Sequence, residues 1–130
     1  MNILTTIRSL NGMVSSKAAS KDAIDSAQKT LRVIFSDDYK NYLHEFGAIS
    51  ARGVELTGLN VSPRINVVDT TLSARASSSN FPSDMYVVEN LAVDGILILQ
   101  SSEGHIFEWQ QSGSCKKIFD DLNGYICEKA

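Results

Sequence analysis

Long apolar runs and cysteines are both scarce in this 130-residue chain. No stretch approaches the ~20 apolar residues of a transmembrane helix, and residues 1–14 lack the basic start and apolar run of a signal peptide. We therefore expect a cytoplasmic protein that does not insert into a membrane. Cys115 and Cys127 could form a disulfide, but two buried thiols in a reducing compartment are the favoured interpretation.

Positive charge is missing from one long window. No Lys or Arg occurs between Arg75 and Lys116, and residues 76–130 carry three basic against eight acidic side chains. Because phosphate contacts require Lys and Arg, we do not expect this half to bind nucleic acid. An acidic surface suits a basic protein partner instead. The candidate partner-binding residues are the acidic residues of the window: Asp84, Glu89, Asp94, Glu103 and Glu108.

Motifs of catalysis and of metal binding are also missing. The His44-Glu45 pair would need a second histidine at position 48 to bind zinc, and that position is alanine. Strand alternation would place Glu108 on the face opposite His105, which disfavours a shared acid–base or metal site. No G-x-S-x-G elbow occurs. We therefore expect no enzyme, no cofactor and no metal; a small hydrolase, the alternative, would need a convergent polar pocket.

Helical periodicity dominates the first 47 residues. Composition (43% hydrophobic, 21% charged) is typical of a soluble protein, and the length fits one domain over residues 1–130. Apolar spacing predicts helices over residues 3–14, 20–31 and 36–47. Ser36 is a favourable N-cap for the third of these helices, and Gly47 is expected to end it in a left-handed conformation.

The period of the pattern changes after residue 47. Strands are predicted over residues 53–59, 85–90, 96–99 (buried on both faces) and 105–109. Asp94-Gly95 and Glu103-Gly104 are expected to turn the last three into a meander. Asp69 could cap a short helix over residues 70–76, and a last helix is expected to begin near Ser114. This order predicts an α+β fold, with helices packed on an antiparallel or mixed sheet.

Five segments together resemble a known family. Residues 31–47, LRVIFSDDYKNYLHEFG, are similar to the lP-x-D-Y-k-x-f-L-x-e-y-n-G segment of the SUKH superfamily, which contains the fungal Smi/Knr cell-wall regulators. The other segments match its later elements in the same order: 53–59 (g-v-x-l-x-G-l), 81–88 (l-P-x-x-x-v-v), 94–99 (G-D-G-x-x-l-l) and 104–109 (G-x-V-y-x-W). Phe35 stands where the family usually has proline, and Phe46 where it usually has a polar residue. The similarity covers about residues 20–127.

The resemblance implies a noncatalytic SUKH-like binding domain. Bacterial members are similar to immunity proteins that neutralise secreted polymorphic toxins, many of them nucleases, and a short chain without added tails resembles this stand-alone type. The expected function is to bind a cognate toxin and occlude its active site; a regulatory or scaffolding module of the Smi/Knr type is the alternative. The acidic window agrees with a basic toxin as partner, although carboxylates at strand edges can also serve only to prevent aggregation.

Overall fold

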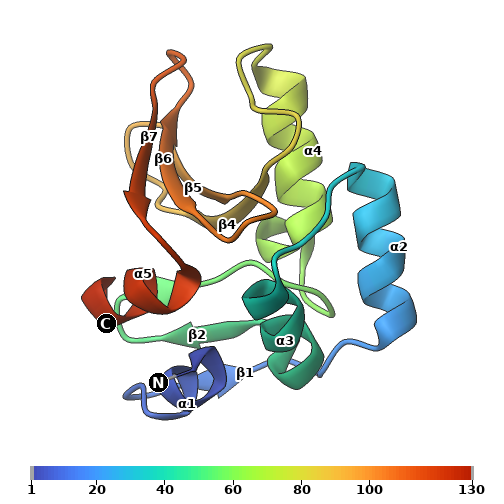
Figure 1. Ribbon diagram of the computed structural model, residues 1–130, viewed down its shortest axis with the longest axis vertical. Helices are drawn as coiled ribbons and strands as arrows, with labels where there is room; N and C mark the ends of the chain where they lie inside the picture. The colour runs from blue at the N-terminus through green and yellow to red at the C-terminus, as the bar shows by residue number, and fades with distance from the viewer. Residues whose placement is uncertain (1, 130) are drawn as a thin grey trace.

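The computed structural model describes residues 2–129, which form five α-helices, a short 3-10 helix and two antiparallel sheets (Figure 1). The smaller sheet has the strand order β1-β2-β3 and the larger sheet the order β4-β5-β6-β7. The predicted α+β class is confirmed. In chain order the elements are α1 (Ile3–Arg8), β1 (Val14–Ser15), α2 (Lys21–Leu31), α3 (Asp37–Phe46), β2 (Ile49–Ala51), β3 (Val54–Glu55), η1 (Pro63–Ile65), α4 (Val67–Ser77), β4 (Tyr86–Asn90), β5 (Ile96–Gln100), β6 (Ile106–Gln110), β7 (Cys115–Phe119) and α5 (Leu122–Lys129).

Local capping signals position α2 and α3 as predicted. The Ser20 hydroxyl accepts a hydrogen bond from the Ala23 amide at 3.1 Å, and the Ser36 hydroxyl accepts one from the Tyr39 amide at 3.3 Å. Both helices bury the apolar residues that the spacing assigned to their inner faces. Gly47 ends α3 with the positive φ expected there, 74°, but its ψ of −62° lies outside the left-handed helical conformation that was predicted.

Three predicted boundaries were wrong. Helix α1 ends at Arg8, short of the predicted 3–14, because the chain turns through Gly12 (φ 68°) and places Val14 in β1. Helix α4 begins earlier than predicted because the Asn66 side chain accepts hydrogen bonds from the amides of Val68 and Asp69. Asp69 therefore lies in the first turn of α4 and does not cap it.

The third error concerns the end of the chain. Residues 115–119 form β7, which pairs with β6 as an outer strand, where the sequence predicted a helix from about Ser114. Helix α5 begins only at Leu122, and the Asp121 carboxylate accepts a hydrogen bond from the Gly124 amide at 2.8 Å. The larger sheet consequently has one strand more than the predicted meander.

The larger sheet separates two hydrophobic cores. Because side chains alternate along a strand, one face contributes Tyr86, Val88, Ile98 and Ile106 to the main core, together with α3 and α5. The opposite face contributes Val87, Leu99 and Trp109 to a smaller core with Ala74 of α4. Helix α4 therefore covers one face of this sheet, while α3 and α5 lie against its other side (Figure 1).

Residues 56–59 join the two sheets. The Thr57 amide donates to the Val88 carbonyl at 2.9 Å, and the Leu59 amide donates to the Gly47 carbonyl at 2.9 Å. The backbones approach so closely here that a Cβ atom on Gly58 would overlap the Gly47 carbonyl oxygen. Only Val54–Glu55 of the predicted strand 53–59 pairs as a regular strand. The amides of residues 56–59 bond instead to four different segments, at Ile49 of β2, Val88 of β4, Ile65 of η1 and Gly47 after α3.

Candidate functional site

The five acidic residues predicted to contact a partner do not form one surface. Asp84, Asp94 and Glu103 are exposed, and Glu108 is half-buried on β6. Asp94 precedes β5 and Glu103 follows it, so the two carboxylates lie at opposite ends of that strand.

Glu89 is buried, with only 4% of its surface exposed, which corrects its assignment to an accessible edge. A β-bulge between Val87 and Glu89 shifts the register, so that Glu89 lies opposite Ile98 and faces the main core. There its carboxylate accepts hydrogen bonds from the Glu55 amide, at 2.7 Å, and from the Tyr125 hydroxyl. Glu89 therefore holds β3, β4 and α5 together and presents no charge to a partner.

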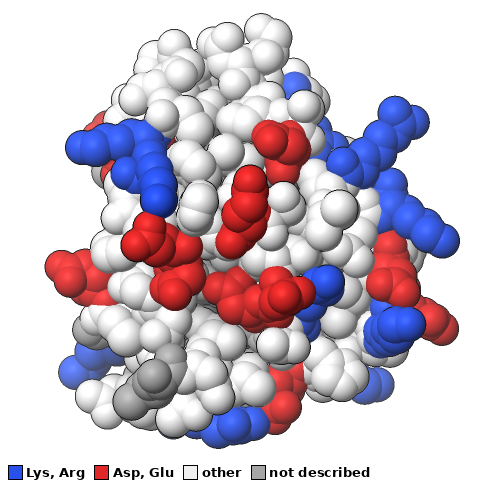
Figure 2. All heavy atoms as spheres, in the orientation of Figure 1, with Lys and Arg blue, Asp and Glu red and all other residues white. Residues whose placement is uncertain are grey.

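A different set of carboxylates does converge. Asp37 and Asp38 at the start of α3, Glu103 in the β5–β6 turn and Asp121 before α5 line one hollow of about 370 Å³, called here the acidic hollow. Figure 2 shows the acidic side chains gathered in a band across the middle of this face, over the start of α3 and the start of α5. Among the predicted site residues, Glu103 alone lines the hollow.

Asp38 is the structural centre of the acidic hollow. Its carboxylate accepts hydrogen bonds from the Gln100 side-chain amide and from the Leu122 backbone amide, each at 3.1 Å, and from the Ser36 hydroxyl. These bonds tie α3 to β5 and α5, which fixes the positions of the neighbouring carboxylates. The Tyr86 hydroxyl supports the same junction by donating to Gln100 Oε1 at 2.8 Å and accepting from the Ser36 amide at 2.9 Å.

The other carboxylates of the hollow are more accessible. Glu103 and Asp121 are exposed residues, and the Asp37 side chain is almost fully exposed. Lys40 also lines the hollow, and its ammonium lies 3.6 Å from the Asp37 carboxylate. The hollow therefore carries a surplus of negative charge. Asp37 and Asp38 were not among the predicted site residues; the sequence signal that could have found them is the Asp pair that opens α3 together with the Asp pair just before α5.

An exposed apolar side chain lies at the rim of this hollow. Ile34 is 67% exposed, whereas its neighbours Val33 and Phe35 are buried. The Phe35 amide donates to Gln28 Oε1 at 2.8 Å, which pins the segment between α2 and α3. Ile34 is thus held outward beside the carboxylates.

Neither cysteine is buried, which corrects the expected pair of buried thiols. Cys115 and Cys127 are free and exposed. Partial desolvation, and secondarily the negative charge of Asp84, raise the pKa of the Cys115 thiol.

An ion pair joins the end of β7 to the segment before α5. The Lys117 ammonium lies 2.7 Å from the Asp120 carboxylate and lowers the pKa of that carboxyl.

Residues 2–129 lack both a metal-binding cluster and a membrane-spanning helix. This part of the chain contains no group of three or more His, Cys, Asp or Glu side chains arranged to hold a metal ion. Within the same residues, no helix has the length and apolar character needed to cross a bilayer.

The fold and the acidic hollow together define an α+β domain that carries a concave surface with a surplus of carboxylates. A family model, SUKH_5, described as SMI1-KNR4 cell-wall, matches residues 2–129. The chain therefore belongs to the SUKH family, as its sequence segments predicted. This membership supports an immunity-protein or Smi/Knr-type domain, and the family is generally noncatalytic. No curated protein matches the chain.

Proposed function

We propose that this protein is an immunity protein that binds a basic cognate toxin and occludes its active site through the acidic hollow. The observation that carries the proposal is the convergence of Asp37, Asp38, Glu103 and Asp121 from three separate parts of the chain. Membership of the SUKH family supports the same function.

Electrostatics favours this mode of inhibition. Complementary charge raises the rate of encounter between two proteins and disfavours wrong partners. If the toxin is a nuclease, its active site must attract phosphate, and a cluster of carboxylates fits such a basic site better than a neutral surface would. Stoichiometric occlusion requires no catalytic group on the inhibitor.

Ile34 supplies the apolar component of the proposed interface. Binding energy in protein interfaces is concentrated in a few desolvated side chains surrounded by a polar rim. Ile34 is exposed, β-branched and held by buried neighbours, so fixing it in a complex removes little conformational freedom.

The test compares two pairs of neutralising substitutions. The hollow variant, Asp37→Asn with Glu103→Gln, removes exposed charges and leaves the bonds of Asp38 intact. The control variant, Asp84→Asn with Asp94→Asn, removes two exposed charges outside the hollow. Each variant is co-expressed with a candidate toxin, taken from the genes beside the one that encodes this protein. Protection of growth and the dissociation constant of the complex are then measured.

The hollow variant should weaken binding about tenfold or more, whereas the control should remain within about twofold of the unmodified protein. An equal loss of affinity in both variants would mean that the interface extends beyond the hollow to Asp84 and Asp94. Unchanged affinity in both variants would show that the hollow is not part of the interface. If the bound partner is not toxic when it is expressed alone, toxin neutralisation is wrong and the regulatory function is favoured.

A further inference from the structure

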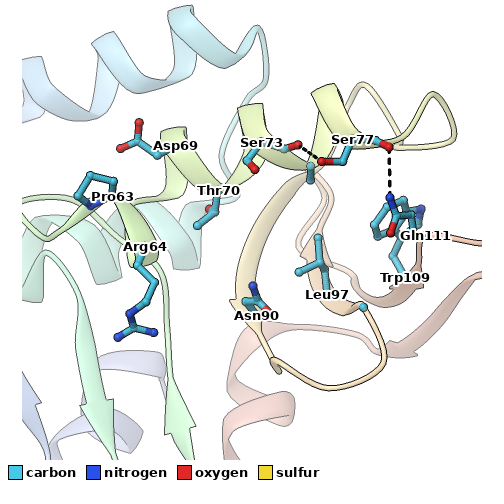
Figure 3. A pocket seen from close by; sticks show the side chains of 12 residues that line it. Pro63, Arg64, Asp69, Thr70, Ser73, Ser77, Asn90, Leu97, Trp109 and Gln111 are labelled. Atoms are coloured by element: carbon cyan, nitrogen blue, oxygen red, sulfur yellow. Dashed lines mark hydrogen bonds between the residues drawn. The ribbon is translucent and has the colours of Figure 1, made fainter.

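A second concave surface lies on the face of the larger sheet that α4 covers. This groove has a volume of about 500 Å³ and runs between α4 and strands β4 to β6 (Figure 3). Asn90 at the end of β4, Gly95 before β5 and Gln111 after β6 line it. These residues mark the end of the strands opposite the β5–β6 turn that carries Glu103, so the groove is separate from the acidic hollow.

Hydrogen-bonding groups line both walls of the groove, and Asp69 adds one carboxylate in the first turn of α4. Helix α4 presents the hydroxyls of Thr70, Ser73 and Ser77, which share one helix face because they are three or four residues apart. The amide side chains of Asn90 and Gln111 come from the sheet side (Figure 3). The Thr70 and Ser77 hydroxyls already donate to carbonyls at the start of and within α4 and therefore offer acceptors, whereas the Ser73 hydroxyl and the Asn90 amide can still donate to a ligand.

The floor of the groove is apolar, and the positive charge at one end is already paired with a carboxylate. Leu97 and Ala74 line the groove between the polar walls. The Arg64 guanidinium, which also lines it, is engaged by both carboxylate oxygens of Glu55 at 2.9 and 3.0 Å. A smaller hollow of about 110 Å³ continues past Arg64 and Asn90, which makes the combined surface elongated.

Trp109 supplies a second, independent indication of a ligand. It lines the groove and is only 2% exposed, and its indole N–H has no hydrogen-bond acceptor among the described residues. Buried donors are normally paired. Gln111 lies at the same end, where its amide donates to the Ser77 carbonyl at 3.2 Å (Figure 3). A carbonyl oxygen that entered beside Gln111 would bring an acceptor to this end.

We propose that the groove binds an extended peptide segment without acidic side chains that places a small apolar side chain over Ala74 and Leu97. A peptide backbone carries one donor and one acceptor per residue, which matches walls of hydroxyls and amides. An acidic side chain would lose its hydration without gaining a partner, because Arg64 is already paired and Asp69, which also lines the groove, is itself negative. This inference does not depend on the proposed toxin neutralisation.

The probe is a pool of acetylated, amidated pentapeptides made of Gly, Ala, Val, Ser and Thr, added to the ¹⁵N-labelled full chain. Trp109 is the sole tryptophan, so a single indole N–H signal reports on the groove. The pool should shift this signal and the amide signals of Ser73 and Asn90. A pool with a central Asp should bind about tenfold more weakly. An unchanged indole signal, or a response to a chito-oligosaccharide in place of the peptides, overturns the proposal.

Substitutions on α4 locate the binding. Ser73→Phe should fill the groove and weaken binding about tenfold, and Ser77→Phe provides a second blocking variant if the first does not fold. Ala76→Phe is the matched control, because Ala76 is exposed on the same helix and does not line the groove. Retained binding in a folded blocking variant contradicts the proposal. The hollow variant should bind the peptides normally, which separates this test from that of the proposed function.

Discussion

Glu89 shows how one buried carboxylate can determine the relation between several elements. Two donors from different parts of the chain, the Glu55 amide and the Tyr125 hydroxyl, both bond to it. Its charge raises the pKa of Tyr125, after the larger effect of burial, so the hydroxyl remains protonated and keeps donating. Both donors would be left without an acceptor in the interior if the carboxylate were removed.

We therefore expect Glu89→Ala to lower the free energy of unfolding by about 3 kcal/mol, because buried donors lose their acceptor. Glu103→Ala is the control: it removes an exposed carboxylate and should change stability by less than about 0.5 kcal/mol. Urea denaturation followed by circular dichroism measures both. A loss below about 1 kcal/mol for Glu89→Ala would mean that solvent replaces the carboxylate at little cost.

Cys115 offers a test of local electrostatics at a single thiol. A raised pKa leaves less of the reactive thiolate at pH 8. Asp84→Asn removes the negative charge that contributes to this shift, so the pKa should fall and alkylation by iodoacetamide should accelerate about twofold. Cys127 serves as the internal control, since its rate should not change. Peptide mass spectrometry resolves the two sites, and an unchanged Cys115 rate would exclude the effect of Asp84.

At the scale of secondary-structure elements, the sequence predicted what local chemistry determines. Ser20 and Ser36 cap helices through bonds to residues three positions ahead, so their roles were visible in the pattern. β7 was missed because its residues form a strand by pairing with β6, a partner that the segment itself does not specify. The bulge that buries Glu89 is likewise a property of strand pairing.

The run at 96–99 is a related case. It was expected to be buried on both faces, but Ile96 and Leu97 are only half-buried. Leu97 lines the groove beside α4, so this helix does not cover the whole sheet face. The candidate site was partly missed because it is also built by contacts between distant residues. Asp38 and Leu122 meet only after folding, so the composition indicated an excess of negative charge but not its position in the structure.

Gly58 and Gly95 are required for different reasons: Gly58 leaves no space for a side chain, whereas Gly95 adopts a positive φ. Gly58→Ala should lower the free energy of unfolding by about 3 kcal/mol or more, because the added Cβ overlaps the Gly47 carbonyl between α3 and residues 56–59. Gly95→Ala adds a Cβ into open space, so only its φ of 67° is unfavourable and the loss should be about 1 kcal/mol. Thermal or urea unfolding measures both. Equal losses would show that the junction relaxes to accommodate the methyl group.

At the scale of the whole molecule, the larger sheet separates two surfaces of different character. The acidic hollow lies at the β5–β6 turn, near α3 and α5, and the largely uncharged groove that Asp69 borders lies between α4 and the opposite end of the strands. The formal net charge is only −3, so the distribution of charge matters more than its sum. A basic partner should therefore approach one end of the molecule, and a peptide segment without acidic side chains should bind at the other.

This separation predicts different responses to salt at the two surfaces. Exposed charges are screened beyond a Debye length of about 10 Å at 0.1 M salt. The association rate constant with the basic partner should therefore fall about tenfold between 0.02 and 0.3 M sodium chloride, with a smaller change in dissociation. The hollow variant should show a shallower slope, because two of the steering charges are gone. Peptide binding to the groove, which involves no free charge pair, should stay nearly constant over the same range. Stopped-flow measurement of both reactions on one protein sample makes the comparison, and a salt-independent association with the partner would contradict electrostatic steering by the acidic hollow.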